Sequence, residues 1–206
     1  MQVRSLKWLL AVTVISGCGE REKGVVPAPG LEPTGEGVLK TDPQPMSRKV
    51  TTEWVAAGGH VGWIHVNKFG YPQFTNGPGQ TGDWPAFRFQ TWRKGAILGL
   101  PNTHTAFGLV QTGDSVTDDA INELAEKSDL VSLSLDGAAV TNDGLERLSQ
   151  LKNLKSLSLG ITETNDAGVK SISRIKSLEY LALDNTKVTD DGMKEIAGLS
   201  SLLIRR

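Results

Sequence analysis

The stretch that decides the fold is LVSLSLDGAAVTNDGLERLSQLKN, residues 130–153. Leucines alternate with small side chains over 130–135, which predicts a short strand with one buried face. Leucines then recur every three residues over 145–151, a spacing that places them on one stripe of a short helix. Thr141 stands where its hydroxyl can cap that helix, and Asp143 follows in the first turn. We therefore predict a unit made of a strand, a turn and a helix.

The same pattern recurs with a period of 24 residues through 106–206. The strand columns are Leu130, Leu154, Leu178 and Leu202, then Leu109, Leu133, Leu157 and Leu181, then Gln111, Leu135, Leu159 and Leu183. The turn and helix columns are Val116, Val140, Thr164 and Val188, then Ile121, Leu145, Val169 and Met193, then Leu124, Leu148, Ile172 and Ile196. Because such a unit buries its apolar face only against its neighbours, we expect a stacked array.

These units, with the segment VTDDG at 188–192, resemble the short-helix leucine-rich repeats of bacterial proteins. The resemblance implies an α/β fold, a leucine-rich repeat solenoid with parallel strands on its concave face and short helices on its convex face. One departure concerns the asparagine that usually follows the strand, which is here replaced by Asp114, Ala138, Thr162 and Thr186. We expect threonine to bond the turn backbone there, which alanine cannot do.

The concave face is the predicted partner-binding surface. Side chains alternate along a strand, so the residues between the leucines face outward. They are Ser132, Ser134, Asp136, Ser156, Ser158, Tyr180 and Asp184. This face is small and weakly polar, and Tyr180 is an aromatic anchor of a type enriched at binding hot spots. We expect it to bind a protein or peptide; the alternative is a solvated face without a partner.

Aspartates recur in the turns every 24 residues, which raises the question of calcium. They are Asp118, Asp119, Asp143, Asp166, Asp190 and Asp191. Calcium needs six to eight converging oxygens, whereas a role at helix N-termini needs no ion and covers every unit. We therefore expect helix capping and no metal site.

Residues 49–105 are rich in aromatic side chains and are predicted to form an N-terminal cap with a loop insertion. TTEWVAAGG predicts a helix that ends at Gly58, HVGWIHV and FRFQTW predict strands, and the Gly/Pro-rich segment 67–85 predicts a loop. The bland interpretation is an aromatic core that covers the first repeat. The alternative is an aromatic platform for sugars or a peptide, made by Tyr71, Phe74 and Trp84.

The N-terminus carries a predicted targeting signal. Arg4 and Lys7 precede the apolar run WLLAVTVI, which is too short to span a bilayer as a helix. The string ISGC at 15–18 resembles the lipobox of bacterial lipoproteins, which implies a signal peptide at 1–17 and a lipid on Cys18. The alternatives are an ordinary cleaved signal or a mistaken start codon. We expect residues 18–48 to comprise the lipidated cysteine and a Pro/Gly-rich disordered linker.

Several function classes are disfavoured. The chain has 22 Lys and Arg against 23 Asp and Glu, so it lacks the basic field that attracts nucleic acid. GPGQTG at 77–82 matches a dinucleotide motif by letter only, since Pro78 interrupts it and no helix follows. His60 and His65 would point to opposite faces of a strand. We expect no enzyme, no catalytic residues and no cofactor.

The sequence thus predicts a membrane-anchored extracytoplasmic scaffold of the bacterial cell envelope for protein–protein interaction. By the family's sorting rule, glycine at 19 favours the outer membrane. The alternatives are a structural envelope protein without a discrete ligand, or a carbohydrate-binding module that uses the aromatic residues of 54–92. Residues 202–206 begin another strand with no capping unit after it, which predicts self-association through an uncapped edge.

Overall fold

The computed structural model describes residues 44–67 and 71–206, so the predicted signal peptide, Cys18 and most of the predicted linker lie outside the described residues. The elements, in chain order, are α1 (Arg48–Ala56), β1 (His60–Val66), β2 (Pro72–Thr75), β3 (Trp84–Phe89), β4 (Phe107–Gln111), α2 (Asp118–Leu124), β5 (Leu130–Ser134), α3 (Asn142–Leu148), β6 (Ser156–Ser158), α4 (Asp166–Ile172), β7 (Tyr180–Ala182), α5 (Asp190–Ile196) and β8 (Leu203–Arg205).

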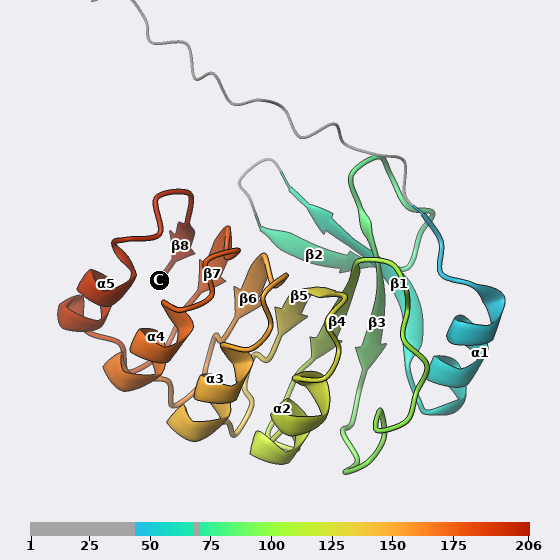
Figure 1. Cartoon of the computed structure of the whole chain (residues 1–206), viewed down its shortest axis with the longest axis horizontal. Coiled ribbons are helices and arrows are strands. Elements are labelled where there is room, and N and C mark those ends of the chain that lie inside the picture. Colours follow the sequence, from blue (N-terminus) through green and yellow to red (C-terminus); the bar gives the residue numbers. More distant parts are fainter. Residues whose placement is uncertain (1–43, 68–70) are drawn as a thin grey trace, which may run out of the picture. The chain divides into compact units, whose positions relative to one another are not determined.

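The strands form one curved sheet with the order β2-β1-β3-β4-β5-β6-β7-β8. Strands β3 to β8 are parallel, whereas β1 pairs antiparallel with both β2 and β3. Helices α2 to α5 stack along one face of the parallel part (Figure 1). This is the leucine-rich repeat architecture that the sequence predicts.

The leucine columns form the core between sheet and helices. Leu133, Leu157 and Leu181 follow one another on β5, β6 and β7, and each is at most 1 % exposed. The turn prediction is also confirmed, because the hydroxyls of Thr162 and Thr186 donate to the carbonyls three residues earlier, at 2.7 and 2.8 Å. The units with threonine therefore close their strand-to-helix turn through its hydroxyl, and the leucines of neighbouring units are buried against one another.

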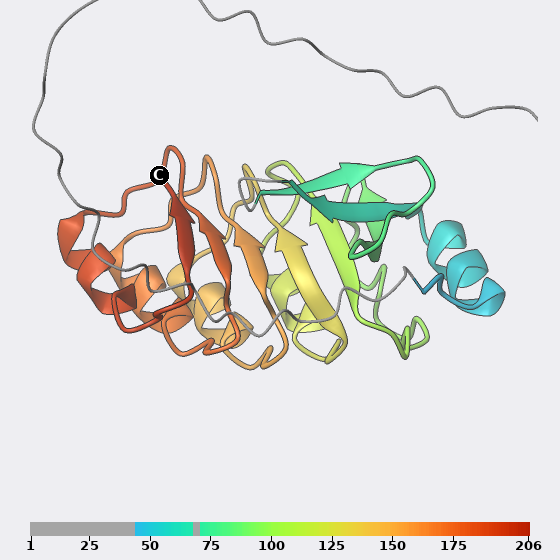
Figure 2. The same ribbon diagram turned by 90° about the horizontal axis from the view of Figure 1, so that it is seen from above.

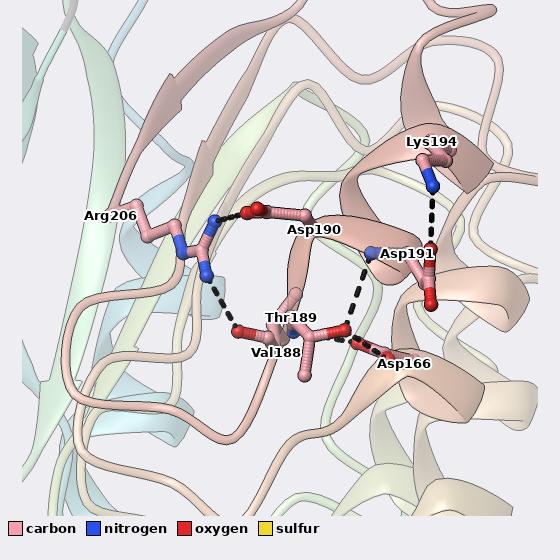
Figure 3. Close-up of polar contacts among 7 residues, drawn as sticks. All are labelled: Asp166, Val188, Thr189, Asp190, Asp191, Lys194 and Arg206. Atoms are coloured by element: carbon pink, nitrogen blue, oxygen red, sulfur yellow. Dashed lines mark hydrogen bonds and ion pairs between the residues drawn. The ribbon is translucent and has the colours of Figure 1, made fainter.

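Aspartate and threonine side chains link alternate pairs of units. The Asp166 carboxylate accepts hydrogen bonds from the backbone N–H and the hydroxyl of Thr189, both at 2.7 Å (Figure 3). The Thr189 hydroxyl in turn accepts from the N–H of Asp191 and caps α5, as predicted. Asp118 and Thr141 repeat the arrangement at α3. The backbone and then the hydroxyl of Thr189 hold the pKa of Asp166 below its usual value.

The N-terminal segment covers the first repeat with a buried aromatic cluster. Helix α1 ends before Gly58, which has a φ of 100°, and it carries Trp54, which is fully buried. The Trp54 ring stacks on Phe87 at 4.5 Å and meets Phe107 of the first repeat edge-to-face at 5.4 Å. Its indole N–H donates to the carbonyl of Pro101. The predicted aromatic core is therefore present, and it continues directly into the leucine core.

Two buried charged residues of the first repeat hold the segment 90–105. The Glu123 carboxylate accepts from the backbone N–H groups of Gly95 and Ile97, at 2.6 and 3.3 Å. The Lys127 ammonium donates to the carbonyl of Leu100, and burial lowers the pKa of this lysine. These side chains supply hydrogen bonds to backbone groups of an irregular segment, which would otherwise be costly to bury.

The prediction of a single loop over 67–85 is wrong. Residues 72–75 of this segment form β2, the outermost strand of the sheet, and β3 already begins at Trp84. The prediction rested on proline, which lacks an N–H and cannot donate to a strand ladder. An edge strand tolerates proline because one side of the strand stays unpaired. Trp84 consequently belongs to the sheet and not to a loop.

The last strand pairs with β7 as predicted, and Leu203 and Ile204 are 55 % and 39 % exposed. Arg206 donates to the carbonyl of Val188 and to Asp190, at 3.0 and 2.9 Å (Figure 3). In the same column, the carbonyls of Val116 and Thr164 accept from the backbone N–H groups of Ala139 and Lys187 in the next unit. Self-association through the β8 edge stays a prediction.

The structure predicts a stabilising substitution at Gln111. This side chain is fully buried in a column that otherwise holds leucine, and neither of its polar atoms has a hydrogen-bond partner among the described residues. We expect Gln111→Leu to raise the free energy of unfolding by about 1–3 kcal/mol, since it removes an unsatisfied buried amide. Urea unfolding of both chains measures the change. A lower midpoint for Gln111→Leu would show that the amide has a partner that stabilises the fold.

Candidate functional site

The β1–β2 hairpin curls over the concave face of the repeats. It runs crosswise to the repeat strands, on the side of the sheet away from α2 to α5 (Figure 2). Ile64 of β1 packs against Gly108 of β4, where a side chain on the glycine would collide with it. Farther along the sheet, the Tyr71 ring meets Tyr180 of β7 edge-to-face at 5.5 Å. Much of the concave face is therefore covered by the chain itself.

The hairpin changes the surface that the sequence predicts. Ser132, Ser156 and Tyr180 were expected to face a partner, yet they are only 3 %, 3 % and 5 % exposed. These three residues pair with one another across β5, β6 and β7, and we call them the first row. The hairpin lies over this face of the sheet (Figure 2). Ser134, Asp136, Ser158 and Asp184, nearer the strand ends, are half-buried. The expectation of an open concave face is thus wrong for the first row, while the binding role of the remaining residues stays a prediction.

The covered row also explains why the concave face is made of small residues. Ala86, Gly108, Ser132 and Ser156 lie side by side on neighbouring strands before the row reaches Tyr180. Side chains of this size leave room for a second layer of backbone. The small residues therefore fit the chain's own hairpin.

A cavity of about 200 Å³ remains between the hairpin and the ends of the repeat strands. Its side-chain walls include Tyr71, Phe74, Arg88, Ser134, Asp136, Ser158, Tyr180 and Arg205. We call this cavity the hairpin cleft. It brings together concave-face residues and two of the three residues of the predicted aromatic platform, Tyr71 and Phe74.

The third platform residue lies elsewhere. Trp84 lines a smaller hollow of about 90 Å³, together with Val66, Ser156 and one side of Tyr180. The Ser156 hydroxyl has no hydrogen-bond partner among the described residues. Tyr71 and Phe74 line the hairpin cleft and Trp84 lines only the smaller hollow, so these three residues do not share one cavity wall. Tyr180 borders both spaces.

The charged groups of the hairpin cleft differ in how they are bonded. Arg205 lies 2.7 Å from Asp184, and its guanidinium stands 5.5 Å from the centre of the Tyr71 ring. Asp136 accepts from the hydroxyls of Ser134 and Ser158 and from the N–H of Gly160. The Arg88 guanidinium lies 4.1 Å from the centre of the Phe74 ring. The cleft thus combines aromatic faces with both signs of charge.

Sequence reasoning missed both arginines. Arg88 stands between Phe87 and Phe89, which are buried in the core, so strand alternation alone would have placed it on the concave side. Arg205 could not be found in this way. A strict 24-residue period aligns Tyr180 with Ile204, whereas the structure pairs Tyr180 with Leu203 and Ala182 with Arg205. The last strand is displaced by one residue from the repeat.

The remaining polar clusters have structural partners. His65 Nδ1 lies 2.8 Å from Asp83, whose other oxygen accepts from the backbone N–H of Gln80, so the pair ties the turn before β3 to β1. The oxygens of Asp118 and Asp166 already accept from threonines. Over residues 44–67 and 71–206, no group of three or more His, Cys, Asp or Glu side chains is arranged to hold a metal ion.

Comparisons with known proteins give one partial likeness. No protein-family model matches the chain, and no curated protein matches it. Among solved structures, an internalin from Listeria monocytogenes is similar, with 19 % sequence identity and a TM-score of 0.41. The match covers 58 % of this chain and 39 % of the internalin chain. The match therefore spans well under half of the internalin chain, and the similarity concerns the fold of the matched part.

The Tyr71–Tyr180 contact gives a spectroscopic prediction. The chain has two tyrosines, so replacing Tyr71 leaves Tyr180 as the single phenol that titrates. Burial raises the pKa of Tyr180. We expect the phenol to titrate above its usual pKa of about 10 in Tyr71→Phe, which keeps the covering ring, and closer to that value in Tyr71→Ala. Phenolate absorbance against pH measures this, and identical curves for the two variants would mean that the hairpin does not cover Tyr180.

Proposed function

We propose that this chain is a leucine-rich repeat scaffold that binds a protein or peptide in the hairpin cleft. The observation that carries the proposal is the convergence of hairpin and repeat strands on one cavity. Its walls hold Tyr71, Tyr180, Arg88 and Arg205, and tyrosine and arginine are the side chains enriched at binding hot spots. Such sites combine apolar walls with a few polar groups that orient the ligand.

The shape of the cleft limits the kind of contact. A globular partner cannot rest on the first row of the concave face, because Ser132 and Ser156 lie beneath the hairpin. What stays accessible is the row near the strand ends, with Asp136 and Ser158, and the exposed face of β2. A single extended segment or a protruding side chain fits this opening better than a flat protein surface.

A photo-reactive side chain placed at the cleft tests the proposal. Gln73 lies on β2, is exposed and lines the cleft, whereas Lys170 is exposed on helix α4. We expect benzoylphenylalanine at position 73, irradiated in intact cells, to give a discrete cross-linked product. The same group at position 170 should not give it. The proposal fails if both positions yield the same products, or if position 73 yields none.

We further propose that the scaffold is anchored in the bacterial cell envelope by lipid on Cys18 and faces the periplasm or the exterior. The support is the order of cationic residues, apolar run and ISGC string in the sequence. Among the described residues, no helix is long and apolar enough to cross a membrane. Two or more acyl chains hold a protein on a membrane stably, whereas a single chain does so weakly.

Metabolic labelling tests the anchor. We expect cells that express the chain to incorporate radioactive palmitate into it, and Cys18→Ser to abolish the label, because the thiol is the acylated group. The chain contains a single cysteine, so no other thiol can take the label. Membrane fractionation of the same cells should show the variant leaving the membrane pellet. Label that persists in Cys18→Ser would exclude this anchor.

A further inference from the structure

We propose that Arg88 is the anchor of a carboxylate-binding site in the hairpin cleft. The Arg88 side chain is half-buried, and among the described residues its guanidinium has neither a hydrogen-bond acceptor nor an ion-pair partner. Partial burial of an unpaired cation is unfavourable unless an acceptor reaches it. A ligand carboxylate would supply that acceptor, so this inference names the ligand chemistry of the binding function proposed above and rests on it.

The strand fixes the direction of Arg88. Its neighbours Phe87 and Phe89 are at most 1 % exposed and point into the core, so the arginine projects from the opposite face, into the cleft. There the guanidinium lies over the Phe74 ring at 4.1 Å from its centre. Contact with an aromatic face leaves the N–H groups at the edge of the guanidinium plane, where a carboxylate can accept two of them.

The carboxylate that lines the same cleft is already engaged. Asp136 accepts from the Ser158 hydroxyl at 2.6 Å, from the N–H of Gly160 at 2.8 Å and from the Ser134 hydroxyl at 3.1 Å. These bonds link β5 to β6 and occupy the oxygens of Asp136 within the repeat sheet. Asp184, the other acidic group near the cleft, is paired with Arg205 at 2.7 Å. Neither of these two carboxylates forms an ion pair with Arg88.

The aromatic walls and the volume of the cleft limit the ligand group that carries the carboxylate. Tyr71, Phe74 and Tyr180 provide aromatic surface around a space of about 200 Å³. This volume is below the usual range of about 300–1,000 Å³ for sites that take drug-sized molecules. It suits a single apolar group that carries a carboxylate. The C-terminal residue of a peptide, with an apolar side chain, has this chemistry.

Binding of a matched pair of probes tests the inference. N-acetyl-phenylalanine carries the carboxylate, and N-acetyl-phenylalanine amide has the same shape without the charge. We expect the full chain in detergent to bind the acid at least about tenfold more tightly than the amide, the size of one charge-assisted hydrogen-bond pair. Calorimetry measures both affinities. Equal affinities, or no binding of the acid at millimolar concentration, would overturn the inference.

Variants assign the effect to one guanidinium. Arg88→Gln should remove the preference for the acid, and Arg88→Lys should restore part of it, because an ammonium keeps the charge but not the paired donors. Arg147→Gln is the matched control, since Arg147 is an exposed arginine on α3 outside the cleft. An unchanged preference in Arg88→Gln would contradict the proposal. Titration of the tyrosines in each variant checks that the hairpin still covers Tyr180.

The two proposals can fail separately. Cross-linking at Gln73 combined with equal affinities for acid and amide would leave the cleft as a binding site and exclude only the carboxylate. Preference for the acid without any cross-linked product would support a small carboxylate ligand and exclude a protein or peptide partner.

Discussion

A single repeat of this chain cannot bury its own leucines, and every other feature of the fold follows from that constraint. Leu157 is removed from water only because Leu133 and Leu181 lie on the strands beside it. The first repeat needs a cover of another kind, because no repeat precedes it among the described residues. Trp54 and its aromatic neighbours supply this cover.

The N-terminal cover determines the character of the concave face. Since β1 turns back antiparallel beside β3, the sheet continues past the repeats and curls until Ile64 rests on Gly108. The same hairpin brings Tyr71 to Tyr180, across strands β3 to β6. The segment that covers the first repeat therefore also covers much of the concave face. The hairpin cleft is the cavity that remains between this segment and the repeat strands.

The sequence was most informative where the structure is local and periodic. Leucine columns predicted the strands and helices, and Thr141 and Thr189 predicted the caps, because each depends on neighbours a few residues away. It failed where distant segments meet. Nothing in the Pro-rich segment containing β2 indicates that it would pair with β1, and the one-residue displacement of β8 is visible only in its pairing with β7. The candidate site was the feature least predictable from the sequence, because the cleft forms only when the hairpin folds over the repeats.

This dependence has a consequence for how the chain could recognise a ligand. In a bare array the concave face would offer hydroxyls, one tyrosine and the carboxylates of Asp136 and Asp184, without a cation among the repeat strands β5 to β7. With the hairpin in place, β3 and β2 add Arg88 and Phe74 to the same space, and β8 adds Arg205. The repeats then serve mainly as a rigid floor, and the residues with the strongest chemistry come from the strands that flank them. For the proposed binding function, selectivity should therefore depend on the flanking strands more than on the repeated positions.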